Sequence, residues 1–328
     1  MVAVRELASV DGPDGRAWDG LVAAHPAATF FHRVGWKRAV EGALGHRSPY
    51  LLAERNGALA GVLPLTCVRS RLFGRRVVSA PFGVHGGPIA EDDAAERALL
   101  DEARRRAEAF RAASLEYRCA LPTAPARHGV DGEHANFAKP IEPDAGANLK
   151  AIPRKQRAMV RKGINQGLSS RLDADIDVCY RVYAESVRNL GTPVFPKSLF
   201  RALRSVFARD SAVTTVLDPH GQPVAAVLSF FFRDRVLPYY GGGLPAARAL
   251  AANDFMYWEV MRRAGEGGYR VFDFGRSKVG SGAYAFKKNW GFPPEPLTYT
   301  HELVASDRAP DLSPNNPKFQ RMIRVWQR

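Results

Sequence analysis

Two stretches of the chain place a tight polar turn between apolar runs, and each predicts a β-hairpin. The first covers residues 51–65 and turns at Asn56-Gly57. The second covers residues 215–230 and turns at His220-Gly221. A glycine-containing pair between apolar runs is a strong local hairpin signal, because glycine tolerates the positive φ that such turns need.

The same succession of elements follows each hairpin. It is a glycine-rich segment, a helix and a short strand: 84–88, 92–112 and 115–118 in the first half, and 239–243, 253–264 and 270–274 in the second. In the second half Asn253-Asp254 is expected to cap the helix. The copies lie about 160 residues apart, which is the size of a whole domain. The pattern therefore predicts two α/β domains of one kind.

The boundary between these domains is expected near residue 145, because proline, glycine and polar residues dominate residues 121–130 and 141–147, as at a domain boundary. We expect an N-terminal domain at 1–145, a C-terminal domain at 146–305, and a linker with an amphipathic helix at 306–328. Asn316-Pro317 gives that helix a start signal. Its apolar face predicts packing onto the second domain, with an interfacial membrane helix as the alternative.

Charge is large and unevenly placed. The 328 residues carry a formal net charge of +14. No acidic residue occurs between Asp144 and Asp173, and seven cations fill that interval: Lys150, Arg154, Lys155, Arg157, Arg161, Lys162 and Arg171. Such a patch favours a polyanion such as tRNA, a diphosphate-linked lipid or an acidic membrane face. A solvated helix face in an arginine-rich protein is the alternative.

Several function classes are not expected. The three cysteines are scattered and lack metal-ligand spacing, which predicts free thiols in a reducing cytoplasm and no metal site. The first residues do not read as a signal peptide, and no apolar run reaches the ~20 residues of a membrane helix. Walker A, Gly-x-Ser-x-Gly and His-Glu-x-x-His motifs are missing, which argues against nucleotide hydrolases, serine hydrolases and zinc proteases.

The densest set of candidate functional residues lies at 272–292. An apolar strand there runs into a glycine-containing loop, and a basic aromatic segment follows. The loop and segment contain Gly275, Gly280 and Gly282 with the cations Arg276, Lys278, Lys287 and Lys288. Glycine lets a backbone approach a ligand closely, and cations suit an anionic substrate or a developing oxyanion. The stretch therefore predicts a group-transfer site.

Six segments taken in order resemble the Fem family of peptidyl and aminoacyl transferases of bacterial cell-envelope synthesis. They are residues 28–37, 152–163, 186–195, 239–243, 253–258 and 272–292. The resemblance covers essentially the whole chain, and it is strongest to the FemAB-like subgroup of exosortase and PEP-CTERM exopolysaccharide clusters. It implies tandem GNAT-like acyltransferase domains of the α/β (α+β) class, each with a mixed, largely antiparallel sheet flanked by helices.

The family's Phe-Lys pair late in the second domain, which is tied to catalysis, matches Phe286-Lys287 here. The resemblance implies an N-acyltransferase acting on an amino group of an envelope or exopolysaccharide precursor, lipid-linked or nucleotide-linked. Aminoacyl-tRNA is the expected donor and acyl-CoA the alternative, with no tightly bound cofactor. The chain departs from some members in lacking a coiled-coil insertion. It also lacks the Gln/Arg-x-x-Gly-x-Gly/Ala loop of acetyl-CoA enzymes.

Roles follow for individual residues. Lys287 is expected to stabilise the oxyanion, beside Phe286, and Asp273 to orient or deprotonate the amine, with a structural hydrogen bond as the alternative. The expected substrate-binding residues are Arg276, Lys278, Tyr239, Tyr240, Asn189, Thr192, Arg154 and Arg157. We expect a cytoplasmic enzyme, at most peripheral at the inner membrane. A non-catalytic protein that binds a precursor or nucleic acid is the alternative from another class.

Overall fold

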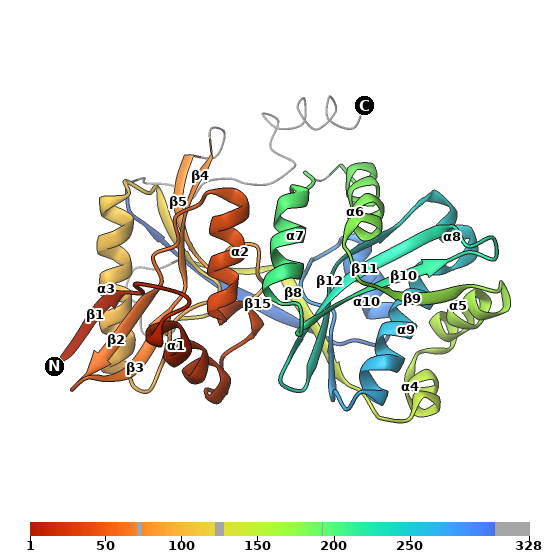
Figure 1. The fold of residues 1–328 in the computed structure, drawn as a ribbon, viewed down its shortest axis with the longest axis horizontal. Coiled ribbons are helices and arrows are strands. Elements are labelled where there is room, and N and C mark those ends of the chain that lie inside the picture. Colours follow the sequence, from red (N-terminus) through yellow and green to blue (C-terminus); the bar gives the residue numbers. More distant parts are fainter. Residues whose placement is uncertain (71–73, 122–127, 192, 306–328) are drawn as a thin grey trace. The chain divides into compact units, whose positions relative to one another are not determined.

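A computed structural model describes residues 1–70, 74–121, 128–191 and 193–305 (Figure 1). Contacts divide these residues into two compact units. The first contains Met1–Glu133 together with residues 297–305, and the second contains His134–Pro296. The predicted amphipathic helix at 306–328 lies outside the described residues.

The first unit is a mixed α/β unit with two sheets. Its elements are β1 (Val2–Glu6), α1 (Pro13–Ala24), the 3-10 helix η1 (Phe30–His32), α2 (Val34–Leu44), β2 (Leu51–Arg55), β3 (Ala58–Leu63), β4 (Leu65–Ser70), β5 (Gly74–Ser79), β6 (Ile89–Ala90), α3 (Asp93–Ala109), β7 (Ser114–Tyr117) and the later part of β15 (Pro294–Leu303). One sheet has the order β1-β2-β3-β6, and the order β4-β5-β7-β15 runs through the other. The predicted hairpin is β2–β3, and its turn residues Asn56 and Gly57 have φ of 51° and 80°, as a two-residue hairpin turn requires.

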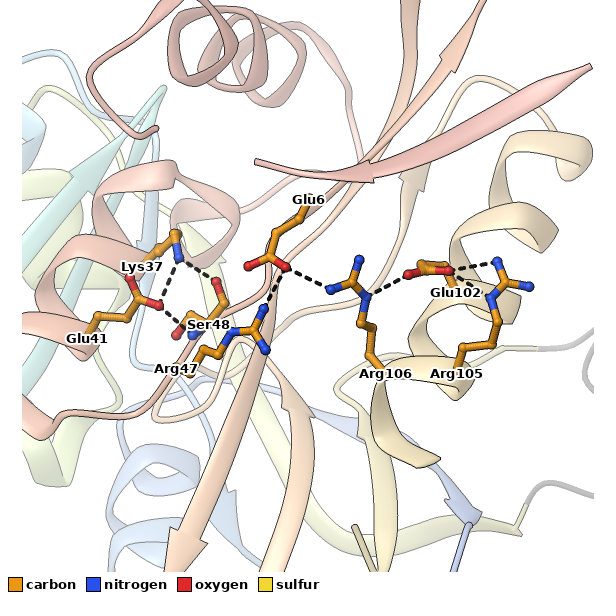
Figure 2. A network of polar contacts seen from close by, with 8 residues as sticks. All are labelled: Glu6, Lys37, Glu41, Arg47, Ser48, Glu102, Arg105 and Arg106. Atoms are coloured by element: carbon orange, nitrogen blue, oxygen red, sulfur yellow. Dashed lines mark hydrogen bonds and ion pairs between the residues drawn. The ribbon is translucent and has the colours of Figure 1, made fainter. Parts of the chain in front are cut away.

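Charged side chains on α3 of this unit are paired with acids (Figure 2). Arg106 lies 2.6 Å from Glu102 and 2.8 Å from Glu6, and Arg105 lies 2.7 Å from Glu102. Arg47 shares Glu6 at 2.9 Å. The basic residues of this surface therefore neutralise neighbours on the same unit, which leaves little charge for a partner.

The second unit is built on one mixed sheet. Its elements are β8 (His128–Pro140), α4 (Ala145–Ala151), α5 (Arg154–Asn165), β9 (Ser169–Asp173), α6 (Asp177–Asn189), α7 (Lys197–Val206), β10 (Ser211–Leu217), β11 (Pro223–Phe232), β12 (Arg235–Gly243), α8 (Pro245–Leu250), α9 (Ala252–Glu266), β13 (Val271–Asp273), β14 (Ser277–Lys278) and α10 (Gly282–Asn289). The strand order is β9-β10-β11-β12-β13-β8, with β14 also on β8. Pairing is antiparallel except between β12 and β13, which are parallel. The mixed α/β fold class is thereby confirmed.

Helices cover both faces of this sheet. Glycine positions show the two sides, because a Cβ on Gly242 would meet Ser186 of α6 and a Cβ on Gly243 would meet Asn253 of α9. The core on the α9 side contains Val227 of β11, Met256 of α9, Phe272 of β13 and the fully buried Trp290. The apolar residues that predicted a hairpin, a helix and a strand thus meet in one core.

Two predictions about local structure were wrong. Residues 121–130 and 141–147 were expected to mark a domain boundary, yet β8 begins at His128 within the first stretch, and its residues 134–140 pair with β13 and β14. Their ladder bonds outweigh the proline and glycine content around them. The contact-based division consequently falls at residue 133, and the limits 1–145, 146–305 and 306–328 stay a prediction. The cap of α9 is Ala251, with φ 56°, and not Asn253-Asp254.

Candidate active site

The parallel strands β12 and β13 part soon after they meet. Ladder pairs join Arg235 to Val271 and Val236 to Phe272. No further ladder pair joins these two strands within the described residues: β12 continues to Gly243 while β13 ends at Asp273. Beyond Val236, β12 keeps its ladder to β11 on one edge, and its other edge can offer backbone N–H and C=O groups to a ligand. The end of β12 therefore forms one side of the candidate site.

A β-bulge lies on β12 within this segment. Ser229 pairs with Pro238 and Leu228 pairs with Tyr240, so Tyr239 is the extra residue. Bulges often re-aim side chains beside active sites. The rings of Tyr239 and Tyr240 lie 4.7 Å apart, edge to face. Tyr240 is buried and Tyr239 is half-buried, so Tyr239 is the more accessible of the two tyrosines predicted to bind substrate.

The glycines after these tyrosines are required by close packing. A Cβ on Gly242 would lie 2.4 Å from Cβ of Ser186, and one on Gly243 would lie 2.6 Å from Oδ1 of Asn253. Real Cβ atoms do not approach so closely. These glycines let α6 and α9 pack against the two faces of β12.

Lys287 of α10 binds the loop that follows β13. Its Nζ donates hydrogen bonds to the carbonyl oxygens of Phe274, Gly275 and Arg276, at 2.7, 3.0 and 3.0 Å. The Nζ also lies 5.5 Å from the ring centroid of Phe137, a distance at which an aromatic face attracts a cation. Three donors of an ammonium group thus meet three acceptors, which fixes the course of residues 274–276.

Burial lowers the pKa of Lys287 to about 7, while the nearby Asp273 carboxylate acts in the opposite direction and Arg276 lowers it further. A lysine in this range changes its charge near neutral pH. Perturbed lysines of this kind are common at functional sites, although structural charge networks also produce them. The role predicted for Lys287 at an oxyanion stays a prediction.

Asp273 makes local contacts at the end of β13. It is buried, its Oδ1 accepts a hydrogen bond from the Gly275 backbone N–H at 2.8 Å, and its Oδ2 lies 3.7 Å from Nη1 of Arg235. This is the structural hydrogen bond weighed as the alternative to a catalytic role. Gly275 has φ 66°, so the turn that Asp273 closes needs a glycine.

The two loop cations differ in exposure. Arg276 is half-buried, and its backbone carbonyl is one of the three acceptors of Lys287. Lys278 is exposed on β14, which pairs with β8. The structure therefore brings five of the predicted residues into one loop and helix: Asp273, Arg276, Lys278, Phe286 and Lys287.

Phe286 belongs to an aromatic cluster beneath this loop. Its ring centroid lies 5.7 Å from Tyr257, 6.3 Å from Phe274 and 6.0 Å from Trp290. Such edge and tilted contacts add to the stability gained from burial. Phe286 is only half-buried, so part of its ring remains available to a ligand.

A buried carboxylate joins this cluster to α5. Oδ1 of Asp254 accepts hydrogen bonds from Nε1 of Trp290 at 2.9 Å and from Nε2 of Gln156 at 3.2 Å. Burial raises the pKa of Asp254, and the two hydrogen bonds oppose that shift. Asp254 therefore holds three elements together, namely α5, α9 and the end of α10.

The remaining predicted residues lie away from the loop. Arg154 and Arg157 are on α5, and Nη1 of Arg157 donates to the carbonyl oxygen of Lys150 at 3.3 Å. Asn189 is the last residue of α6 and is exposed. Thr192 lies outside the described residues. Within the same segment Phe195 reaches the second-unit sheet, with its ring 5.9 Å from that of Tyr240.

Two further residues of the site, Lys139 and Asp254, were not predicted from the sequence. Lys139 of β8 places Nζ 4.6 Å from the ring centroid of Phe292 and 3.5 Å from the Trp290 carbonyl oxygen, and burial lowers its pKa. It was missed because no strand was predicted between residues 130 and 141, although the buried Ala135 and Phe137 alternate as a strand would. Asp254 was missed because it was interpreted as a cap.

Metal-binding clusters, disulfides and membrane-spanning helices are absent from the described residues. They contain no group of three or more His, Cys, Asp and Glu side chains that would hold a metal ion. The three cysteines are free thiols. None of the described helices is both long and apolar enough to span a membrane.

Residues 154–288 match the family model of the acetyltransferase (GNAT) domain. The second unit therefore carries a GNAT-type domain, which supports an acyltransferase activity with an unspecified donor. This range contains α5, both strands that part, and the Phe286-Lys287 pair. No curated protein matches the chain in sequence.

Solved structures are similar over nearly the whole chain. FemX is 15% identical with a TM-score of 0.70, and the match covers 99% of this chain and 100% of FemX. A tandem GNAT protein from the clavulanic acid biosynthesis pathway is 15% identical with a TM-score of 0.60, covering 94% and 100%. Saccharomyces cerevisiae N-myristoyltransferase with bound myristoyl-CoA is 11% identical with a TM-score of 0.54, covering 97% and 86%. At such identities the likeness concerns the fold, and it confirms the predicted tandem GNAT-like architecture.

Proposed function

We propose that this protein is an N-acyltransferase that moves an acyl or aminoacyl group onto an amine at the end of β12. The observation that carries the proposal is the parting of β12 and β13 within the GNAT-type domain, next to a loop held by Lys287. Backbone C=O groups on the edge of β12 that β13 leaves can accept from the α-ammonium group of an aminoacyl donor, whereas an acyl-CoA donor would pair its amides there. Either donor would have its reactive carbonyl beside residues 274–277.

The loop supplies the electrostatic part of the chemistry. The carbonyls of Gly275 and Arg276 point at Lys287. Because a trans peptide directs its C=O and N–H to opposite sides, the Arg276 N–H lies on the side of its peptide away from Lys287. A backbone N–H that is fixed in this way favours a negatively charged oxygen. Lys287 thus fixes a donor that would meet the oxyanion and adds its own charge behind it.

The reaction balances without a redox partner. The amine nitrogen attacks the donor carbonyl, the new C–N bond forms, and the bond from carbonyl carbon to the donor's oxygen or sulfur breaks. The amine proton leaves to a base and the leaving group takes up a proton. Asp273 is our candidate for orienting the amine, and Tyr239, Arg276 and Lys278 are our candidates for contacting the substrates.

Aminoacyl-tRNA is the proposed donor, on the resemblance to the Fem family. The proposed acceptor is an amino group on a lipid-linked or nucleotide-linked precursor of the envelope or of an exopolysaccharide. The enzyme would act in the cytoplasm, at or near the inner membrane. The acyl-CoA alternative has support from the fold likeness to a transferase solved with myristoyl-CoA.

The test supplies labelled aminoacyl-tRNA and labelled acyl-CoA separately to the purified full chain with a panel of amino-sugar nucleotides. The amide product is detected by mass spectrometry. We expect product with wild type and a loss of at least tenfold in Lys287→Met, while Lys288→Met on the exposed side of α10 retains activity. Product from acyl-CoA alone would replace the donor. No product from either donor would favour a non-catalytic binding protein.

A further inference from the structure

The outward face of α5 forms a basic hollow. It has a volume of about 670 Å³ and is lined by Arg154, Arg157, Ala158, Arg161, Lys162, Asn165 and Gln166. We call this surface the α5 hollow. Ala158 lies among the cations, so its short side chain leaves room that a larger residue would fill.

The cations of α5 lack acidic neighbours. The helix carries five Lys and Arg residues and no acid in its sequence. None of the five makes an ion pair with a described acid. The contrast with α3 is direct, because Arg105 and Arg106 on that helix share Glu102, and Arg106 also pairs with Glu6 (Figure 2). Uncompensated charge of one sign on one face favours a ligand of the opposite sign.

Packing fixes which side of α5 faces outward. Gln156, Val160 and Gly163 are buried on the opposite side. A Cβ on Gly163 would lie 2.8 Å from Cβ of Phe255 on α9, so the two helices approach closely there. Since α5 is held along its length, the cations of the hollow are presented by a rigid element.

The arrangement suits a phosphodiester strand better than a bilayer or a single diphosphate. From Arg154 to Lys162 the helix rises about 12 Å, which is the axial length of three to four phosphates on one nucleic-acid strand. The cations are strung along that length and do not converge on one point. The hollow is lined by no large apolar side chain that would enter a bilayer, and the exposed Ile164, at 45%, lies outside its lining.

The helix that carries the hollow is fixed to the end of α10. Its helix begins after Pro153, whose Cδ would lie 3.0 Å from a Cβ on Gly291, directly after α10. Gln156 on α5 and Trp290 after α10 share Asp254. A nucleic-acid strand bound to α5 would therefore be held by a helix that is fixed to α10, which carries Phe286 and Lys287.

We infer that the α5 hollow binds the phosphodiester backbone of an RNA whose end reaches the candidate active site. The role of this RNA as the acyl donor rests on the proposed function, and RNA binding would support an RNA-linked donor over acyl-CoA. Binding itself is independent of catalysis, so the two can be tested separately.

The experiment measures binding of a fluorescently labelled tRNA transcript to the full chain by anisotropy over a range of salt concentrations. We expect Arg154→Ala/Arg161→Ala to weaken binding at least tenfold near physiological salt. The slope of log affinity against log salt should become shallower by about 1.4, at roughly 0.7 per single-strand phosphate contact. Lys155→Ala, on the same helix but outside the hollow, is the matched control and should weaken binding by less than about threefold. Circular dichroism checks that each variant folds.

Ala158→Leu separates shape from charge, because it fills the hollow and removes no cation. We expect weaker binding with the salt slope unchanged. Equal effects of Arg161→Ala and Lys155→Ala would overturn the inference in favour of diffuse attraction. Stoichiometric displacement of the transcript by inorganic pyrophosphate would make the hollow a diphosphate site. Binding only to vesicles containing phosphatidylglycerol would make it a membrane contact. Absence of transcript binding by the wild-type chain, with acyl transfer from acyl-CoA intact, would refute this inference and leave the transferase proposal standing.

Discussion

Lys287 is predicted to affect stability and activity in opposite directions as the pH rises. Its folded-state pKa of about 7 lies below the ordinary ~10.4 of an unfolded lysine. Between these two values the unfolded chain binds more protons than the folded chain, so the free energy of unfolding increases with pH. The gain approaches about 1.4 kcal/mol per pH unit, which gives about 2 kcal/mol between pH 7 and 9.

Activity should fall over the same interval. A protonated Lys287 satisfies the carbonyls of Phe274, Gly275 and Arg276 with three N–H donors. The neutral amine keeps only two donors and loses its charge. The loop is then held less firmly and the oxyanion is less stabilised. We expect kcat/KM to decrease above an apparent pKa near 7.

Lys287→Met shows how much of the change in stability and activity with pH is due to Lys287 and how much to other titrating groups. It leaves three carbonyl groups without their donor, at about 1–3 kcal/mol for each that stays buried and unsatisfied, so we expect a loss of about 3 kcal/mol or more at pH 7. The variant should also lose the rise in stability between pH 7 and 9, and Lys288→Met should keep it.

The assays are urea unfolding at several pH values and an NMR titration of 13C-labelled lysine side chains. A Lys287 pKa above about 9.5 would refute the reasoning. The same conclusion would follow if Lys287→Met and Lys288→Met unfolded at the same urea concentration.

Two further predictions concern the packing around the site. Asp254→Val should lower the free energy of unfolding at pH 7 by about 2–4 kcal/mol, because the buried donors of Trp290 and Gln156 lose their acceptor. Asp254→Asn keeps an acceptor. Its stability relative to wild type should increase as the pH rises, since burial raises the Asp254 pKa and penalises the charged form. Equal losses in both variants would contradict this explanation. Gly242→Ala should lower the free energy of unfolding by about 1–3 kcal/mol, because the new Cβ overpacks against Ser186. Gly282→Ala is the control and should be tolerated, since a Cβ there would meet nothing within 4 Å. Recovery of stability in Gly242→Ala/Ser186→Gly would identify the clash as the cause.

Local signals were enough to predict the hairpins, the helices after them and the duplication. Asn56-Gly57 specifies its own turn, and the helix at 253–264 repeats its apolar residues at helical spacing, so both could be predicted without knowing their neighbours. The tandem α/β architecture followed from the order of such elements. Strand β8 had a local signal in the alternation of Ala135 and Phe137, but its pairing with β13 joins residues more than a hundred positions apart, which no local pattern predicts.

The site shows the same limit. The sequence of residues 272–292 predicts a loop with glycines and cations, and in the structure Asp273, Arg276 and Lys287 lie close together there. What Lys287 contacts depends on the direction of three backbone carbonyls, which only the folded loop sets. The bulge at Tyr239 had one local signal, Pro238 inside a strand, which the hairpin pattern on either side obscured.

The two halves of the duplication differ where the second unit has its candidate site. In the first unit the segment after the hairpin is bonded to neighbouring strands: the Val84 carbonyl accepts from the Tyr299 hydroxyl at 2.6 Å, and the Gly86 N–H donates to the Arg118 carbonyl at 3.0 Å. In the second unit β12 runs on past its last ladder pair with β13 at Val236. Backbone groups already bonded within the fold have little to gain from a ligand, whereas those at an open segment do. This difference is why we assign the chemistry to the second unit, although both units share one order of elements.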